Sequence, residues 1–440
     1  MTPSGDSRVV EVLGRVPRFW SILFSLVVFG WLAGFFLHPE MLTKVGVGHY
    51  RIELAPQRFQ EVWFVDTLAV LAANDAITAG TDPYVRNPLD YFNRPHVYGP
   101  IWLQLRHLGL TRFHTPAVGI VLVTTFLAAV LLFLRPRSLG SLLWCTAVVC
   151  TTPILAAIER GNNDLVIFLI LMPMVPCLLS KRQWVRWLAF PIVVLAAALK
   201  YYPAAAGLLL LAIAGSARET QWRMGATAVA LTLVGWHVAA SIPSFALVPA
   251  PAGVLTFGAS HVFHELGFQG IGPRAVAMGI AFVAVCFWWR SPGMRDWRPD
   301  PAALREWRYF VLGSVLLSGC FWVSQNFAYR WILAIWMVPF LWSLSRDLNA
   351  PAAIVKLARL TAGLLLVLLW GEAVLVFMFS VWMPDKLMPA LRWISLSMQP
   401  FTWAFFLCLL GFLTNFLRGC WNDFLEQKTR LQPTKNAAPS

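Results

Sequence analysis

Residues 184–215 read WVRWLAFPIVVLAAALKYYPAAAGLLLLAIAG, an apolar stretch that is interrupted once, at Lys200-Tyr201-Tyr202-Pro203. An α-helix rises about 1.5 Å per residue, so each arm of about 16 residues reaches about 24 Å, slightly less than the roughly 30 Å hydrocarbon core of a bilayer. The stretch therefore predicts two membrane helices joined just below the membrane surface. Irregular backbone at that depth is tolerated only where it is buried in protein or lines a wet cavity.

The whole chain has the same character. Of its 440 residues, 58% are hydrophobic and 13% are charged, which is about half the charged fraction of an average soluble domain. This composition excludes disulfide-rich secreted scaffolds, coiled coils, disordered chains and outer-membrane barrels. We expect an all-α fold, a polytopic membrane helical bundle. Its twelve spans are predicted at residues 18–37, 115–134, 139–157, 164–180, 185–199, 201–215, 223–241, 273–289, 309–323, 329–344, 360–380 and 399–418.

The charge pattern predicts how the chain is oriented. Lys and Arg number 35 against 21 Asp and Glu, a net charge of +14 that would ordinarily suggest a nucleic-acid partner. These residues lie instead in short clusters between the apolar runs, mostly in alternate connections, as the positive-inside rule requires of cytoplasmic loops. We therefore expect a multi-pass protein of the cell membrane, with both termini cytoplasmic and no nucleic-acid partner. A single domain is expected over residues 1–420, followed by a disordered cytoplasmic tail at 421–440.

The long segment at 38–114 is then the first extracytoplasmic loop, and it contains the strongest candidate for catalysis. It begins with a predicted interfacial helix around Asp66, and the run Gly80-Thr81-Asp82-Pro83-Tyr84 follows. A carboxylate at this position can meet both a lipid-linked substrate and a hydroxyl group from the aqueous side. Asp66 is therefore the candidate general base, although a solvated surface aspartate is the simpler interpretation of this motif alone.

Three short turns are expected on the same side of the membrane as Asp66. They are Glu159-Arg160-Gly161-Asn162-Asn163-Asp164, Leu199-Lys200-Tyr201-Tyr202-Pro203 and Asn326-Phe327-Ala328-Tyr329-Arg330. Each places a cation at the end of a predicted span. Arginine and lysine can bind a phosphate through charge-assisted hydrogen bonds, and they can also simply reach toward lipid headgroups.

These segments together resemble glycosyltransferase family 87 of the GT-C superfamily. The resemblance rests on V-D-x-x-x-x-x-A-A-x-x-x-x-x-x-G-x-D-P-Y, on R-G-N-x-D, on L-K-x-x-P and on N-x-x-Y-R, and it covers roughly residues 60–380. It implies an inverting transferase that uses a polyprenyl-phosphate sugar, with mannose as the expected sugar and Asp66 as the base. The chain departs from the family pattern at Tyr98-Gly99-Pro100 and in the loop at 260–265.

The expected site follows from these turns and from the resemblance. Lys200, Arg330, Arg160 and Tyr329 are expected to bind the donor phosphate. The substrate cavity is expected to be lined by Asp82, Tyr84, Asn163, Asp164, His264 and Glu265. His261 and His264 have the i, i+3 spacing of a pair of metal ligands, but no further ligands accompany them, so no metal is expected. Glu372 lies within a predicted span, where a carboxylate must face the protein interior.

No cofactor is expected, because the chain lacks the glycine-rich loops that hold nucleotide phosphates. The expected partners are a polyprenyl-phosphate sugar donor, a lipid or glycan acceptor and membrane lipids. Two alternative functions stay open at this stage. One is a transporter or flippase for a lipid-linked sugar, and the other is a surface polysaccharide ligase or polymerase, which would use a diphosphate-linked lipid.

Overall fold

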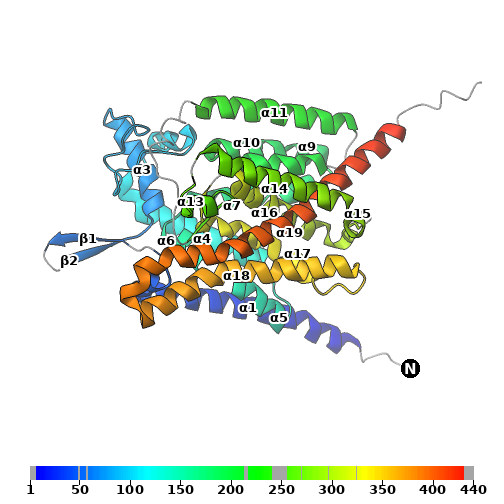
Figure 1. Ribbon diagram of the computed structural model, residues 1–440, viewed down its shortest axis with the longest axis horizontal. Coiled ribbons are helices and arrows are strands. Elements are labelled where there is room, and N and C mark those ends of the chain that lie inside the picture. The colour runs from blue at the N-terminus through cyan, green and yellow to red at the C-terminus, as the bar shows by residue number, and fades with distance from the viewer. Residues whose placement is uncertain are drawn as a thin grey trace, which may run out of the picture.

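The computed structural model describes residues 6–47, 50–55, 58–212, 217–239, 255–268, 270–295, 297–323 and 325–430. Within these ranges the chain is almost entirely helical, and most of the long helices run along a common direction (Figure 1). The strands form two small antiparallel sheets, β1–β2 and β3–β4. The expectation of an all-α helical bundle is confirmed.

Seven helices are 19 residues or longer: α1 (Asp6–Leu37), α4 (Thr115–Phe133), α11 (Ala217–Ala239), α14 (Ile271–Arg290), α16 (Leu304–Val323), α18 (Ala352–Trp382) and α19 (Leu387–Arg430). The shorter α-helices are α2 (Glu40–Lys44), α3 (Val65–Thr78), α5 (Leu139–Val149), α6 (Thr152–Glu159), α7 (Asn163–Leu171), α8 (Met174–Leu178), α9 (Gln183–Trp187), α10 (Ala189–Leu199), α13 (His261–Glu265), α15 (Pro292–Arg295) and α17 (Val338–Leu344).

The 3₁₀ helices are η1 (Pro100–Leu108), η2 (Arg112–His114), η3 (Tyr202–Ala212), η4 (Pro301–Ala303), η5 (Ala328–Met337) and η6 (Pro384–Lys386). The strands are β1 (Tyr50–Ala55), β2 (Arg58–Val62), β3 (Thr256–Phe257) and β4 (Asn326–Phe327). Runs of 3₁₀ helix longer than three or four residues are uncommon. Three of the 3₁₀ helices in the described residues are nevertheless longer: η1 has 9 residues, η3 has 11 and η5 has 10.

In the described residues, each of the twelve predicted spans overlaps helical segments, but the helices are less uniform than expected. Residues 213–215 and 240–241 of two predicted spans lie outside the described residues. In the described residues, five helices are long and apolar enough to cross a membrane, or six if α5 and α6, which meet at a bend of 54°, form one span. Several other apolar runs are split, for example into α7 with α8 and into η5 with α17. These helices are consistent with a membrane protein, and the number of twelve crossings stays a prediction.

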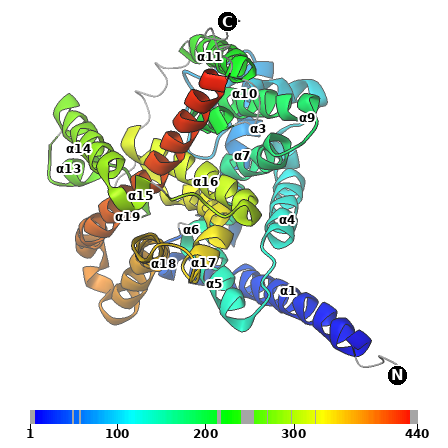
Figure 2. The ribbon, with the colours of Figure 1, turned by 90° about the vertical axis from the view of Figure 1, so that its right-hand side faces the viewer.

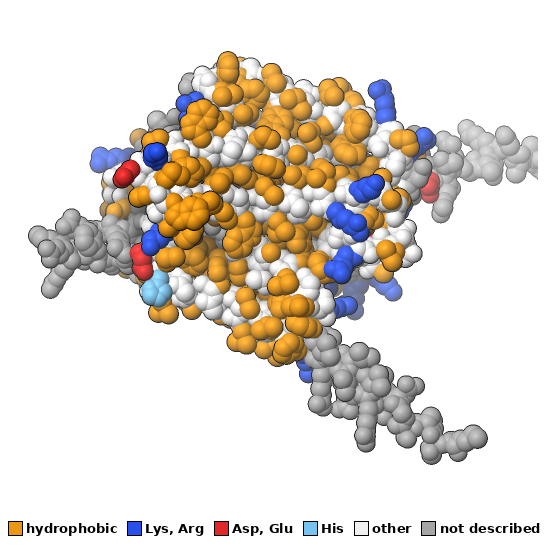
Figure 3. Space-filling model, turned by 60° about the horizontal axis from the view of Figure 1, so that its bottom comes forward, with side chains coloured by type: hydrophobic (Ala, Val, Ile, Leu, Met, Phe, Trp, Pro, Cys, Tyr) orange, Lys and Arg blue, Asp and Glu red, His pale blue; other side chains and the backbone are white. Residues whose placement is uncertain are grey.

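The surface supports the same interpretation. A broad hydrophobic area covers the middle of the molecule, and Lys and Arg side chains gather at the end where helix α1 begins (Figure 3). Helix α14 lies at the edge of the bundle (Figure 2), and its apolar residues are mostly on the outside, since only 11% of its most apolar 18-residue stretch is buried. An exposed apolar helix of this kind is expected to face lipid.

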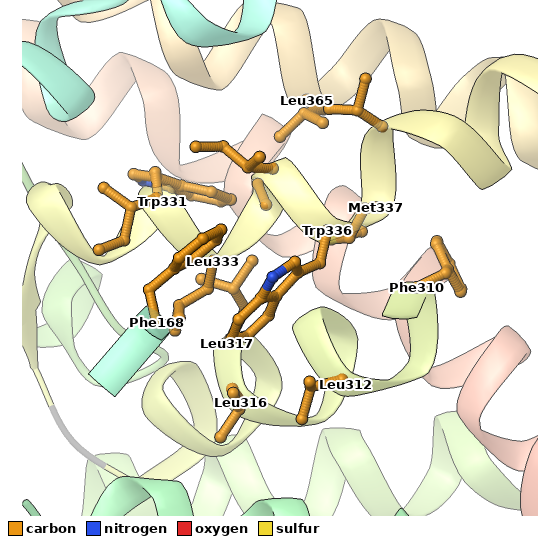
Figure 4. Close-up of a cluster of buried hydrophobic side chains, with 14 of the residues drawn as sticks. Phe168, Phe310, Leu312, Leu316, Leu317, Trp331, Leu333, Trp336, Met337 and Leu365 are labelled. Atoms are coloured by element: carbon orange, nitrogen blue, oxygen red, sulfur yellow. The ribbon is translucent and has the colours of Figure 1, made fainter. Parts of the chain in front are cut away.

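The core lies around α16, η5 and α17 (Figure 4). The rings of Phe168 and Trp336 stack with their centroids 4.5 Å apart, which joins α7 to η5. Helix α16 approaches η5 closely at Gly313, where a Cβ atom would lie 2.7 Å from the carbonyl oxygen of Leu333. This packing fixes the position of η5 and therefore of Tyr329 and Arg330 at its start.

Helix α19 extends beyond the predicted end of the domain. The segment 421–430 is helical, in contrast to the disordered tail expected from residue 421 onward, and residues 431–440 lie outside the described part. On this last stretch the rings of Trp421 and Phe424 lie 6.2 Å apart.

Candidate functional site

The helix that contains Asp66 is anchored to the turn between α6 and α7 by its backbone. The amide of Phe64 donates to the carbonyl oxygen of Glu159 and that of Asp66 to Arg160, both at 2.9 Å. Phe64 has a left-handed φ of 61°, which is rare for a bulky residue, and Gly161 has a φ of 53°. These contacts place the first turn of α3 directly beside Arg160.

Each carboxylate oxygen of Asp66 accepts two hydrogen bonds. Oδ1 accepts from Arg160 Nη2 at 2.8 Å and from Arg94 Nη1 at 3.2 Å. Oδ2 accepts from Arg160 Nε at 2.9 Å and from Asn162 Nδ2 at 2.6 Å. Asp66 is only 2% exposed, so it is not the solvated aspartate of the simpler interpretation.

Arg94 in turn is held by a second buried carboxylate, Asp90. Arg94 donates from Nε to Asp90 Oδ2 at 3.0 Å and from Nη2 to Asp90 Oδ1 at 2.9 Å, a bidentate pair. Burial alone would raise the pKa of Asp66, but the charges of Arg160 and Arg94 and the hydrogen bond from Asn162 hold it well below its usual range. Asp66 is therefore ionised at neutral pH.

Asn162 joins this carboxylate to a second one. Its Oδ1 accepts from the backbone amide of Asp164 at 2.8 Å and so caps helix α7, while its Nδ2 donates to Asp66. Asp164 Oδ1 accepts from Lys200 Nζ at 2.5 Å and from Tyr202 Oη at 2.9 Å. Arg330 Nε lies 3.6 Å from Asp164 Oδ2. Through Asn162 and Asp164, the turn between α6 and α7 thus contacts α3, the end of α10, η3 and η5.

Aromatic rings surround the ammonium group of Lys200. Its Nζ lies 5.2 Å from the ring centroid of Tyr98, 5.8 Å from that of Tyr329 and 6.0 Å from that of Tyr202. Arg330 lies over the same Tyr202 ring at 4.7 Å. Cation–π contacts of this kind stabilise a desolvated cation.

A glycine lets the outer loop approach the end of α10. The amide of Gly99 donates to the carbonyl oxygen of Leu199 at 3.1 Å, and a Cβ atom at Gly99 would lie 1.7 Å from the carbonyl oxygen of Ala198. Trp102 Nε1 donates to the same Leu199 oxygen at 3.1 Å. Gly99 therefore permits a tight contact immediately before Lys200.

We call seven acidic and basic side chains of this region the acidic–basic cluster: Asp66, Asp90, Asp164, Arg94, Arg160, Lys200 and Arg330. Glu159, which precedes Arg160 in the same turn, is also fully buried. The side chains of Asp90 and Asp164 have no exposed surface and that of Lys200 is 5% exposed. In such surroundings a charge interacts much more strongly with an anionic ligand than it would in water.

The structure brings together most of the residues predicted from sequence. Asp66, Arg160, Asp164, Lys200, Tyr329 and Arg330 belong to one neighbourhood, and the buried side chain of Asn163, whose Nδ2 has no hydrogen-bond partner, lies between Asn162 and Asp164 in the chain. Tyr84 lies at its edge, where its Oη donates to the carbonyl oxygen of Tyr98.

Three predicted cavity residues have other surroundings. Asp82 is exposed and its Oδ1 accepts from the amide of Tyr84, which is the role of a turn residue. His264 is exposed on α13, a short helix packed against α19, and Glu265 lies 3.7 Å from Arg392 of α19. In the described residues, these contacts link His264 and Glu265 to α19 rather than to the acidic–basic cluster.

Glu372 and His261 form hydrogen bonds to Leu255 and Ser395, which lie outside the acidic–basic cluster. Glu372 Oε2 accepts from the amide of Leu255 at 2.7 Å, beside a cavity of about 20 Å³, and so holds a residue with a φ of 57°. His261 Nε2 lies 2.8 Å from Ser395 Oγ on α19. No group of three or more His, Cys, Asp or Glu side chains arranged to bind a metal ion occurs among the described residues.

Sequence reasoning missed Arg94, Asp90 and the aromatic contact of Tyr98. Asp90 and Arg94 lie in the irregular stretch between α3 and η1, which no periodic pattern marks. The available signal was their i, i+4 spacing, the usual spacing of an acid–base pair on one face of a turn.

The comparisons with known proteins give no family. No family model, no curated protein and no solved structure matches the chain.

Proposed function

We propose that the chain is an inverting glycosyltransferase of the cell membrane. It would transfer a sugar, mannose by the family resemblance, from a polyprenyl-monophosphate donor to a lipid or glycan acceptor on the extracytoplasmic face. The twelve spans, the GT-C fold and the cytoplasmic termini belong to the same proposal. The observation that carries it is the acidic–basic cluster, in which three buried aspartates and four basic side chains from separate segments of the chain lie together.

The proposed reaction assigns a role to each part of the cluster. A hydroxyl is a weak nucleophile, so Asp66 takes its proton as the new carbon–oxygen bond forms. The bond between the sugar and the phosphate oxygen breaks at the same carbon, which becomes cation-like, as in glycoside hydrolysis. Lys200, Arg330 and Arg160 stabilise the negative charge that develops on the leaving phosphate.

The monophosphate donor is part of the proposal because of the family resemblance. A polysaccharide ligase or polymerase that uses a diphosphate-linked lipid stays the alternative. The test below supplies monophosphate donors and therefore distinguishes the two.

The position of the cluster favours a transferase over a flippase. Alternating access requires that a substrate be contacted from both faces of the membrane. The proposed substrate groups all lie where α3 and α7 begin, where α10 ends and where η5 begins. Figure 1 shows α3 at the end of the bundle opposite to the start of α1, and the hydrogen bonds and ion pairs described above join the other segments to it.

The test is transfer by membranes that contain the protein. Radiolabelled polyprenyl-monophosphate sugars are added, and movement of label into lipid and glycan fractions is measured with wild-type protein and with Asp66→Asn. Transfer by the wild type alone is the expected result. Reporter tags near Asn87 and after Pro292 should be extracytoplasmic and cytoplasmic respectively. If the donor label stays in place, or if the tag near Asn87 is cytoplasmic, the proposal is wrong.

A further inference from the structure

Asp66 has no free position for the proton that it is proposed to accept. A carboxylate offers about four lone-pair positions, and Arg160, Arg94 and Asn162 fill four with hydrogen bonds of 2.6 to 3.2 Å. An acceptor hydroxyl must itself donate to one of these oxygens before it can transfer a proton. One of the present partners therefore has to leave when the acceptor binds.

Arg94 is the partner that can leave most easily. Arg160 is bound to Asp66 by two hydrogen bonds and Asn162 also caps α7, so the loss of either would cost more than one contact. Arg94 makes a single bond, the longest of the four, and its side chain is 31% exposed compared with 19% for Arg160. It also lies on the irregular stretch between α3 and η1.

The hydrogen bonds of Arg94 allow it to release Asp66 without losing Asp90. The bonds to Asp90 use Nε and Nη2, and Nη2 also donates to the carbonyl oxygen of Val65 at 3.1 Å, whereas the bond to Asp66 uses Nη1. A small rotation of the guanidinium group can therefore break one bond and keep the bidentate pair. The neutralisation of the buried Asp90 carboxylate is then preserved, which avoids the large cost of an unpaired buried charge.

We propose that Arg94 is a positioning residue that occupies Asp66 Oδ1 until the acceptor hydroxyl replaces it. This inference rests on the proposed function, in which Asp66 is the base. When Arg94 withdraws, the hydroxyl donates to Oδ1, its oxygen bonds to the sugar carbon, and the bond to the phosphate oxygen breaks. The proton then resides on Asp66 and the electron pair on the released lipid phosphate.

The same movement makes Asp66 a better base. The titratable and charged groups that face Asp66 come from several elements: Arg160, Arg94, Asp90, Lys200, Tyr98 and Tyr329. A nearby positive charge favours the ionised form of a carboxyl group, so the withdrawal of one arginine increases its affinity for a proton. Arg160 and Asn162 remain and keep the carboxylate in place. Acceptor binding and activation of the base are therefore one event.

The test uses the double variant Asp90→Asn/Arg94→Gln, because Arg94→Gln alone would leave Asp90 buried without its partner. The matched control is Arg86→Gln, an exposed arginine of the same loop. Melting temperatures verify that each variant is folded. We expect the acceptor KM of the double variant to fall about tenfold, since the hydroxyl no longer displaces a charge-assisted hydrogen bond, while the donor KM is unchanged.

A second measurement does not depend on activity. The infrared carboxyl band of Asp66, identified by its loss in Asp66→Asn, is followed as the pH is lowered. In the double variant its protonation should begin about 1 to 2 pH units higher than in the wild type. An unmoved band, or a donor KM raised tenfold as for a phosphate ligand, would overturn the inference. If the wild type transfers no sugar, the proposed function fails, and the infrared titration alone decides whether Arg94 controls Asp66.

Discussion

Lys200 and Asp164, 36 residues apart in the chain, form a buried ion pair with 2.5 Å between Nζ and Oδ1. The side chain of Lys200 is 5% exposed and that of Asp164 has no exposed surface. The sequence suggested that Lys200 is either a phosphate ligand or a lysine that reaches toward lipid headgroups. Burial at this depth, with a carboxylate partner and three surrounding tyrosine rings, excludes the second role in this conformation.

The first prediction concerns the stability of this pair. Lys200→Met should lower the free energy of unfolding by about 3 to 5 kcal/mol, because it leaves the Asp164 carboxylate buried without its closest cation. The double variant Lys200→Met/Asp164→Asn should recover most of this loss, since no unpaired charge remains. Thermal melting in detergent measures both. Equal melting temperatures for the single and double variants would contradict an energetic role of the pair.

The second prediction concerns donor binding by Arg330. Arg330→Gln removes a cation that lies 3.6 Å from Asp164 but makes no bidentate pair with it, so folding should be largely retained. Loss of one charge-assisted phosphate contact is worth about 1.5 to 3 kcal/mol, which corresponds to a donor KM raised about 10- to 100-fold. Arg392→Gln on α19 is the control, because Arg392 pairs with Glu265 instead. Similar donor KM values in both variants would rule out phosphate binding by Arg330.

Much of this arrangement is predictable from the sequence, because it depends on chain connectivity. Apolar runs of membrane length alternate in direction, so the turns at Arg160, Lys200 and Arg330 must lie at the same end. The structure agrees at this coarse level. The prediction of one continuous helix for each run was wrong in detail. The breaks at Thr151 and Met172 lie just before Pro153 and Pro173, and proline interrupts the hydrogen bonding of a helix.

The contacts of the loop at 38–114 were much less predictable. Asp90 and Arg94 reach Asp66 only because the irregular stretch folds back over α3, and hydrophobic periodicity has no signal for such a path. His264 and Glu265 were assigned to the cavity because they lie in an outer loop. Their helix instead packs on α19, since membership of a loop does not specify which side of the bundle it covers.

The third prediction concerns Gly99. Gly99→Ala should strongly destabilise the loop or displace it from α10, because the added Cβ would lie 1.7 Å from the carbonyl oxygen of Ala198. Backbone atoms cannot yield as a flexible side chain can, so the melting temperature should fall and transfer activity should fall with it. Gly30→Ala in α1 is the control, since nothing lies within 4 Å of its Cβ position. Equal melting temperatures in the two variants would show that the close contact is absent.

The fourth prediction concerns pH and His96. Burial lowers the pKa of His96 from 6.5 to about 4, and the ring packs against Tyr84 and Tyr98. The unfolded chain therefore takes up a proton at a higher pH than the folded chain does. The stability that His96 contributes is fully present above about pH 6.5 and is lost as the pH falls to about 4, a change of about 3 kcal/mol.

Melting temperatures at pH 7 and pH 5 measure this effect. The decrease between the two pH values should be smaller in His96→Gln than in the wild type, because glutamine does not titrate. His107→Gln serves as the control, since His107 is exposed on the same loop. An identical pH dependence in His96→Gln and in the wild type would contradict the assignment of a buried, neutral imidazole.

The last prediction concerns the base itself. Asp66→Asn should lower the rate of transfer about 100- to 10,000-fold, because an amide keeps the size of the side chain but cannot accept the proton of the acceptor hydroxyl. Donor binding should change little, since Lys200 and Arg330 keep their own partner, Asp164. Asp82→Asn is the control: Asp82 belongs to the same loop but is exposed and caps a turn, so this variant should keep most of its activity.

The decisive comparison is with Asp164→Asn. Asp164 is bound to two cations and should affect donor KM more than the rate of the chemical step. If Asp164→Asn abolishes turnover while Asp66→Asn transfers sugar normally, the base is Asp164. If neither variant changes turnover, the buried carboxylates are structural and the transport function is the better explanation of the cluster.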